Sequence, residues 1–204
     1  GEPIRRIQGG QELNRHTIPW MARIESRDEN GTPLVGCGAT LIAPAWVLTS
    51  AHCIRAPAAS RKIFLGRHSI YKQDEKAETE KGAQTIDISN VFPHPDHNKM
   101  AEHDIALVEL NEHAQLNTHV RVITLASKDR DIFACPEPYA TVLGWGREAP
   151  GAFPNAHLQS LRVAMLENAT ACKELYKPYD EATHLCAMGK EGQGVCTGDS
   201  GGPL

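Results

Sequence analysis

No stretch of the 204-residue sequence approaches the apolar length that a membrane span requires. Basic residues form no stripe, acidic residues form no terminal tail, and the formal net charge is only −4. These absences give no reason to expect a membrane or nucleic-acid partner. A chain of this length with 41% apolar residues can form a sizeable core. We therefore expect one domain of two layers or two small barrels.

The six cysteines include no CxxC pair, which argues against a zinc ribbon or thioredoxin chemistry and favours disulfides. Composition alone does not choose among the pairings. No apolar signal-peptide core follows Gly1, so we expect a secreted precursor whose signal was removed, or a sequence that starts downstream of it. Two N-x-S/T sequons, at Asn30 and Asn168, agree with a secreted, extracellular chain, although each can arise by chance.

Three short stretches carry residues suited to nucleophilic catalysis. Ser200 lies between glycines in the sequence GDSGGPL, where backbone N–H groups can converge on an oxyanion. A serine hydroxyl is a weak nucleophile, so this stretch predicts a histidine base and a buried carboxylate elsewhere in the chain. The stretch LTSAHC supplies His52, and the stretch HDIALVEL supplies Asp104. An aspartate at the start of a strand can be a turn residue, but the other two stretches favour a catalytic role.

The order of these residues separates two kinds of hydrolase. The Gly-x-Ser-x-Gly pattern of residues 198–202 also describes the nucleophile elbow of lipases and esterases. In those enzymes the serine precedes its acid and its histidine, whereas here the order is His52, Asp104, Ser200. The lipase or esterase interpretation is therefore disfavoured.

Together with Ile7-Gln8-Gly9-Gly10, the three stretches resemble the chymotrypsin-fold (trypsin-like, S1) family of serine endopeptidases over essentially the whole chain. The resemblance implies an all-β fold of two antiparallel Greek-key barrels, at about residues 20–112 and 120–204, within a peptidase domain of residues 7–204. Repeated short strand patterns agree with this fold, and residues 46–49, 86–92 and 120–125 are expected to form three of these strands. Family members continue past GGPL, so the resemblance also predicts missing final strands of the second barrel and a missing C-terminal helix.

The resemblance assigns the catalytic roles. It implies that Ser200 attacks the scissile carbonyl, that His52 accepts and then returns the proton, and that Asp104 orients His52. The N–H groups of Gly198 and Ser200 would form the oxyanion hole. The expected reaction is hydrolysis of a peptide bond in a protein or peptide substrate.

Activation is expected at the start of the chain. Residues 1–6 can be a flexible tail, but the resemblance implies a remnant of an activation peptide that ends at Arg6. Cleavage by a trypsin-like protease would free the α-amino group of Ile7, and Asp199 would accept this ammonium. A buried carboxylate without a cation is strongly unfavourable, so we expect the uncleaved chain to be an inactive or weakly active zymogen.

Substrate preference is expected to depend on the residues six and five before the nucleophile. In relatives these form the floor of the primary pocket, and here they are Gly194 and Val195. Gly194 has no charge with which to bind arginine or lysine, so the resemblance implies an uncharged P1 residue, with small or medium aliphatic side chains preferred.

The resemblance also implies a disulfide between Cys37 and Cys53 and another between Cys172 and Cys186. The remaining Cys135 and Cys196 are expected to pair with cysteines beyond Leu204.

No cofactor or metal is expected. Arg67 occupies the place of an acidic calcium ligand in some relatives, and the spacing of His94, His97 and His103 is typical of loop histidines rather than of a metal site. Protein inhibitors are further partners that the resemblance implies. The alternative function is a catalytically silent protease homologue that acts as a binding or cofactor module, but such proteins usually lose one of the three catalytic residues.

Overall fold

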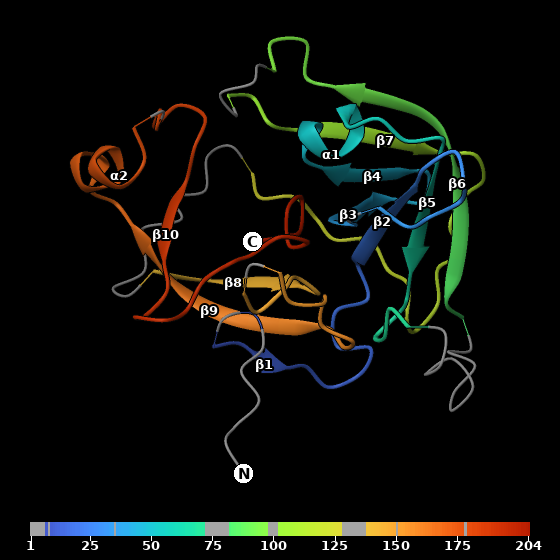
Figure 1. Cartoon of the computed structure of the whole chain (residues 1–204), viewed down its shortest axis with the longest axis horizontal. Coiled ribbons are helices and arrows are strands. Elements are labelled where there is room, and N and C mark those ends of the chain that lie inside the picture. Colours follow the sequence, from blue (N-terminus) through green and yellow to red (C-terminus); the bar gives the residue numbers. More distant parts are fainter. Residues whose placement is uncertain are drawn as a thin grey trace.

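The computed structural model describes residues 7, 9–34, 36–71, 82–97, 102–127, 138–149, 151–177 and 179–204. These residues form a mostly β structure in which two sheets lie next to each other, and two short helices lie outside the sheets (Figure 1). The elements are β1 (Gln11–Glu12), β2 (Met21–Arg27), β3 (Cys37–Ala43), β4 (Trp46–Thr49), α1 (Ala51–Arg55), β5 (Ser60–Leu65), β6 (Gln84–Pro93), β7 (Ala106–Leu110), β8 (Tyr139–Gly144), β9 (Gln159–Leu166), α2 (Ala169–Leu175) and β10 (Cys186–Met188).

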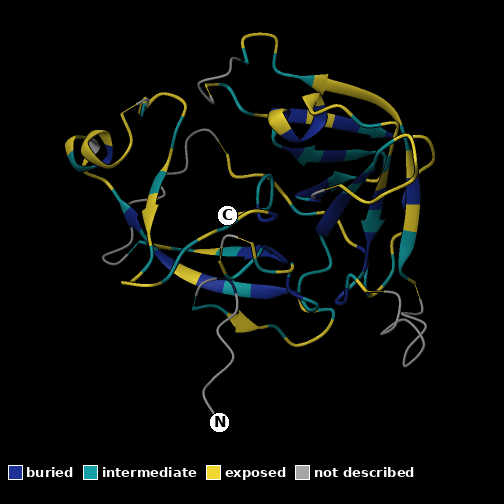
Figure 2. Ribbon diagram, viewed as in Figure 1, coloured by how far each residue is buried: buried dark blue, intermediate teal, exposed yellow. Residues whose placement is uncertain are grey.

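The first sheet is a closed barrel with the strand order β2-β3-β4-β7-β6-β5, and all its pairings are antiparallel. Apolar and polar residues alternate along strands of this barrel, so that one side of each such strand faces the interior. In β7, for example, Ala106, Val108 and Leu110 are buried while Leu107 is exposed. Side chains from all six strands fill the barrel, and Figure 2 shows the buried segments on its inside.

The second sheet is built on β9. β8 pairs with β9 over residues 139–144, whereas β1 and β10 pair with the two ends of β9 along its other edge. Its apolar side chains form two small clusters, one around Trp145 and one around Ile7. The described residues of this half therefore form an open four-stranded sheet. No described helix is long and apolar enough to cross a membrane.

The strand expected at residues 120–125 is wrong, because the described segment has no assigned strand. It is held by separate hydrogen bonds, from Arg121 N to Pro19 O (2.9 Å) and from Ile123 N to Leu41 O (3.1 Å). Leu41 lies one residue beyond Thr40, the last residue of β3 that pairs with β2. Val120, at the start of the segment, is fully buried in the barrel core. The crossover is therefore held by one buried side chain and by separate hydrogen bonds, without the continuous pairing that defines a strand.

Candidate active site

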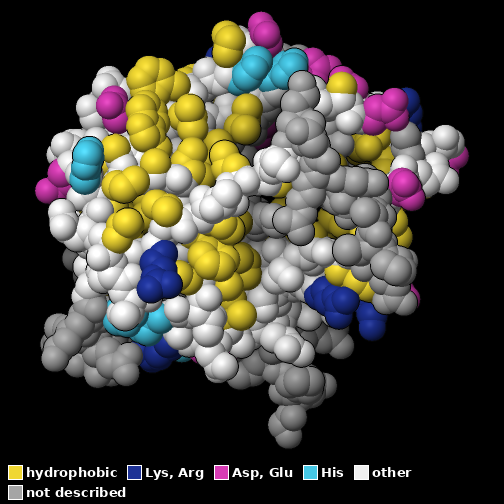
Figure 3. Space-filling view, turned by 180° about the vertical axis from the view of Figure 1, so that it is seen from behind, with side chains coloured by type: hydrophobic (Ala, Val, Ile, Leu, Met, Phe, Trp, Pro, Cys, Tyr) yellow, Lys and Arg dark blue, Asp and Glu magenta, His cyan; other side chains and the backbone are white. Residues whose placement is uncertain are grey.

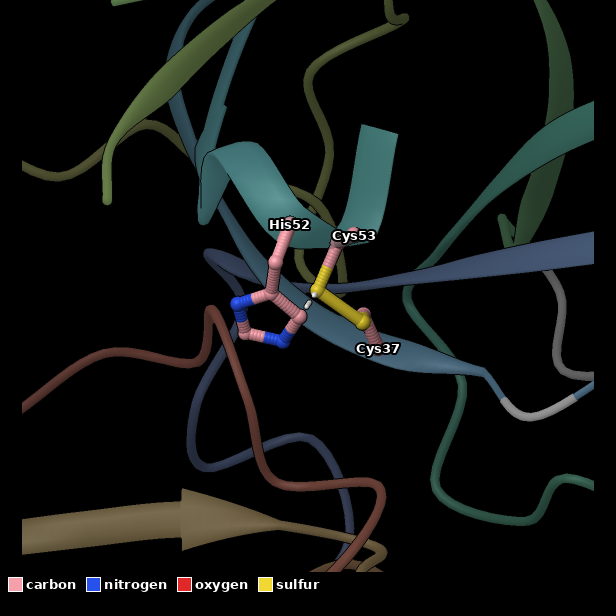
Figure 4. Close-up of side chains that lie close together, drawn as sticks. All are labelled: Cys37, His52 and Cys53. Carbon is pink, nitrogen blue, oxygen red and sulfur yellow. Dashed lines mark hydrogen bonds between the residues drawn. A yellow bond between two sulfur atoms is a disulfide. The ribbon is translucent and has the colours of Figure 1, made fainter. Parts of the chain in front are cut away.

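His52 lies on α1, which begins directly after β4. Ala51, Cys53 and Ile54 of this helix are buried, and the helical turn therefore points His52 outward, with 49% of its side chain exposed. A disulfide joins Cys53 to Cys37 at the start of β3, as the resemblance predicts (Figure 4). The disulfide fixes the helix that carries the imidazole to the barrel wall.

Asp104 lies two residues before β7 and binds His52 twice. Its Oδ2 is 2.6 Å from His52 Nδ1, and its Oδ1 accepts the backbone N–H of His52 at 2.9 Å. Burial by itself would raise the pKa of this carboxyl. The two hydrogen bonds, together with the positive charges available on His52 and His97, outweigh the burial, so the pKa of Asp104 lies below its usual value. Asp104 is therefore ionised at neutral pH and holds the imidazole through Nδ1, so that Nε2 is the other ring nitrogen.

His97 differs from the expectation of a surface-loop residue. Its side chain is only 8% exposed, and its Nδ1 lies 3.8 Å from Asp104 Oδ1 and 3.1 Å from the Glu102 carbonyl oxygen. His94 and His103 stack on each other, with ring centroids 4.6 Å apart. The sequence contained no periodic signal that could have placed His97 beside Asp104, because neither residue lies in a helix or strand.

Ser200 lies in a tight turn that packs against the barrel. Its carbonyl oxygen accepts the N–H of Gly38 at 2.8 Å. The next residue must be glycine, because Gly201 has φ +77° and a Cβ there would lie 2.3 Å from Thr49 Oγ1. Gly198 also has a positive φ, of +105°. Two glycines thus allow the serine turn to approach the ends of β3 and β4.

Ser200 and His52 come close without a hydrogen bond between them. Cys53 Sγ lies 3.5 Å from His52 Nε2 and 3.8 Å from the Ser200 carbonyl oxygen. A disulfide sulfur has no proton to donate, so the first contact is a packing contact. Across the described residues, Ser200 Oγ and His52 share no hydrogen bond. The structure therefore brings His52 and Asp104 together and places the Ser200 backbone beside them, while the serine–histidine link is not formed.

A cavity of about 620 Å³ opens beside Asp104. Residues 201–204 and Ser50 lie along it, and its apolar lining includes Ile105, Ile123 and Leu125. The cavity lining can therefore accept apolar side chains next to the Asp104 carboxylate. Apolar side chains also gather in a broad group on the face turned away from the viewer of Figure 1 (Figure 3).

Asp199 is buried next to the serine. Its Oδ1 accepts the N–H of Gly146 at 2.7 Å, and its Oδ2 accepts the N–H of Cys196 at 3.0 Å. Burial raises the pKa of this carboxyl above its usual value, although the two hydrogen bonds and the charge of Arg23 oppose the shift. The carboxylate thus lies in a site where a further cation would be stabilising.

Ile7 is fully buried, packed with Leu161 and Val163 of β9. Its φ is +28°, a backbone conformation that β-branched residues rarely adopt. Arg6, the other half of the expected cleavage site, lies outside the described residues.

The remaining predicted residues are less enclosed. Val195 is 61% exposed, and a Cβ at Gly194 would meet no heavy atom within 4 Å. Of the sequons, Asn30 lies in an exposed turn, and Asn168 caps α2 by accepting the N–H groups of Thr170 and Ala171.

The second predicted disulfide, Cys172–Cys186, is also confirmed. It ties α2 to β10. Cys196 is a free thiol within the described part of the chain, and Cys135 lies outside that part.

Comparison with known proteins identifies the family. The family model described as Trypsin matches residues 7–204. The chain is 33% identical to human kallikrein-4 over 202 residues, which cover 97% of this chain and 71% of the relative. It is 32% identical to human kallikrein-2, with coverages of 98% and 74%.

Solved structures show the same likeness. The structure of GrC superimposes with a TM-score of 0.83 at 30% identity, over 96% of this chain and 82% of that one. Neuropsin, a serine protease expressed in the limbic system of mouse brain, gives a TM-score of 0.77 at 27% identity, over 96% and 80%. The predicted all-β, trypsin-like fold is thereby confirmed, and the chain belongs to the trypsin family of serine proteases.

Proposed function

We propose that this protein is a secreted serine endopeptidase that hydrolyses peptide bonds through a Ser200–His52–Asp104 triad and an acyl-enzyme. The observation that carries the proposal is the double contact between Asp104 and His52, at 2.6 Å to Nδ1 and 2.9 Å to the backbone N–H. A carboxylate in this position fixes the tautomer with hydrogen on Nδ1 and leaves Nε2 free to accept a proton.

The steps follow from this tautomer. Ser200 Oγ attacks the carbonyl carbon while its proton passes to His52 Nε2, and Asp104 stabilises the imidazolium that forms. The negative charge on the carbonyl oxygen is held by the N–H groups of Gly198 and Ser200, each worth about 3–4 kcal/mol in the transition state. His52 then protonates the leaving amine, and water hydrolyses the acyl-enzyme by the same proton route.

Activation by cleavage between Arg6 and Ile7 is the second part of the proposal. It is supported by the burial of Asp199. Among the described residues, the carboxylate accepts two backbone N–H groups and forms no ion pair with a cationic side chain. The positive φ of Ile7 also supports it, because cleavage removes the preceding peptide and releases this strained torsion. The new ammonium of Ile7 would pair with Asp199 and set the position of the adjacent serine turn. The activator would be a protease with trypsin-like specificity.

The proposed preference is for an uncharged, aliphatic P1 residue. It rests on Gly194 and Val195, which place no carboxylate where an arginine or lysine side chain would need one. Protein inhibitors of serine proteases are the further partners that this activity would have.

The test is limited cleavage with immobilised trypsin, which is then removed so that it does not contribute activity. Intact mass gives the new N-terminus, and chromogenic peptides with Ala, Val, Leu, Phe or Arg at P1 give the rates. We expect hydrolysis to appear with the Ile7 N-terminus and to be fastest for an aliphatic residue. The Arg6→Gln variant is the matched control and should stay silent. Full activity of the intact chain would contradict the activation mechanism, and a fastest arginyl substrate would contradict the P1 preference.

A silent homologue that acts as a binding module is the second candidate. The observation that favours it is the missing hydrogen bond between Ser200 and His52 in the described residues, with His52 Nε2 lying against the Cys53 sulfur. Catalytic hydrogen bonds are often unformed without substrate, so the endopeptidase remains the proposal. Absence of hydrolysis after clean cleavage would favour the binding module.

A further inference from the structure

Three ionisable side chains meet far from the proposed active site. Glu12 is on β1, His68 follows β5, and His157 precedes β9. Glu12 Oε1 lies 3.1 Å from His68 Nε2 and 3.2 Å from His157 Nδ1. In Figure 1, β1 forms the lower edge of the second sheet, well separated from α1, which carries His52.

The backbone holds this Glu12–His68–His157 cluster in place. The carbonyl oxygen of His68 accepts two hydrogen bonds, from Trp145 Nε1 at 2.9 Å and from Leu158 N at 3.0 Å. Glu12 pairs with Gln159 in the β1–β9 ladder, and Ser69 forms a bridge with His157. Backbone hydrogen bonds and strand pairing therefore connect the three segments that carry these side chains, and they hold the segments next to one another without a ligand.

The two histidine rings are stacked, so the partly exposed His157 ring has to turn before both imidazole nitrogens point at one metal ion. The rings are nearly parallel, at 16°, with centroids 5.0 Å apart. His68 is only 2% exposed, whereas about a quarter to a third of the His157 and Glu12 side chains is exposed. One side of the cluster thus lies in the protein interior and the other is open to water.

The donor atoms have the spacing of a metal site. Tetrahedral zinc with bonds of about 2.0–2.1 Å separates neighbouring ligand atoms by about 3.3–3.4 Å. The two measured distances, 3.1 and 3.2 Å, are close to this value, and all three donor atoms lie within 4.8 Å of one another. Two imidazole nitrogens and one carboxylate oxygen form a known zinc donor set, in which water takes the fourth position.

A second group with suitable atoms, Cys37, His52 and Cys53, does not qualify. Its two sulfurs are joined in a disulfide and are not available as thiolate ligands.

We propose that Glu12, His68 and His157 bind a divalent transition metal, with zinc as the class that fits the donors. The metal would replace the shared protons between the imidazoles and the carboxylate, with water as the fourth ligand. Its effect would be to clamp β1 to the rest of the molecule. Gln193 Nε2 already donates to the carbonyl oxygen of Gly9 at 3.2 Å, so the clamp would further restrain the segment that follows Ile7.

The test is calorimetric titration of chelator-treated whole protein with zinc chloride. The variants are Glu12→Gln and His157→Asn, which change partly exposed side chains and leave the buried His68 in place. The matched control is His16→Asn, since His16 belongs to another stacked histidine pair, with His119 at 3.7 Å, and asparagine tolerates its φ of +59°. Circular dichroism establishes that each variant is folded.

We expect the wild type and His16→Asn to bind one equivalent of zinc. Glu12→Gln and His157→Asn should lower the affinity by at least about tenfold, since the loss of even an outer partner costs that much. Zinc should also raise the melting temperature and slow amide exchange in residues 9–13 of the wild type and of His16→Asn, but not of Glu12→Gln or His157→Asn. Cobalt(II) should give the visible absorption of a tetrahedral site. Equal zinc binding by all four proteins, or no binding by the wild type, would overturn the proposal.

Discussion

Replacement of Asp104 by asparagine tests the proposed division of roles most quantitatively. The amide keeps the shape of the side chain but presents either an N–H₂ group to His52 Nδ1 or a neutral oxygen. The first arrangement stabilises the wrong tautomer, with the proton on Nε2, and the second removes the negative charge beside the developing imidazolium. An ion pair about 4 Å apart contributes about 4 kcal/mol at the effective dielectric constant near a protein surface. This energy corresponds to a loss of about 10³-fold in kcat/KM.

The assay is kcat/KM of the cleaved protein on its best chromogenic peptide, measured for the wild type, Asp104→Asn and the control Asp87→Asn. Asp87 pairs with Lys62 on the exposed side of the barrel, so the control removes one carboxylate without touching the site. Because 80% of the Asp104 side chain is shielded from water, thermal unfolding accompanies the kinetics to establish that the variant is folded. If folded Asp104→Asn retains more than about a tenth of the wild-type kcat/KM, the assigned role is wrong.

Three further predictions concern stability. Replacement of both Cys37 and Cys53 by alanine opens a loop with a sequence separation of 16 residues, so urea unfolding should give a free energy lower by about 3 kcal/mol. Leu41→Ala, at a fully buried barrel position, should lower the same quantity by about 2–5 kcal/mol, whereas no loss would contradict the described core. The pKa of Asp199 is raised in the folded protein. Its contribution to the free energy of unfolding is therefore full below the unfolded pKa and is lost as pH rises through the folded pKa. Urea unfolding at several pH values should show this loss in the uncleaved wild type and not in Asp199→Asn.

The sequence predicted most of the barrel because its strands alternate. The run of residues 46–49 coincides with β4, and the alternation of residues 86–92 lies within β6. It missed β1 and β10, which have only two and three residues and so carry no measurable period. It also expected a strand at residues 120–125. There Val120 packs into the barrel core, but the backbone forms only isolated hydrogen bonds and no ladder.

The candidate site was predictable where its residues lie in recognisable local sequence. His52 and Asp104 are recognisable from the residues around them, and the structure places their side chains in direct contact. The burial of His97 and the meeting of Glu12, His68 and His157 have no local signal, because these contacts join segments 56 or more residues apart or depend on loop conformation. Such contacts follow only from the closed barrel and the β1–β9 pairing.

Labelling by a fluorophosphonate probe tests the proposed triad most directly, because the probe reacts only with a serine activated by a base. The probe is added before and after cleavage at Arg6–Ile7, and peptide mass spectrometry locates the label, with His52→Ala as the control. We expect a label on Ser200 of the cleaved wild type and none on the intact chain or on the control. An unlabelled Ser200 after complete cleavage would mean that the three residues do not act as a triad.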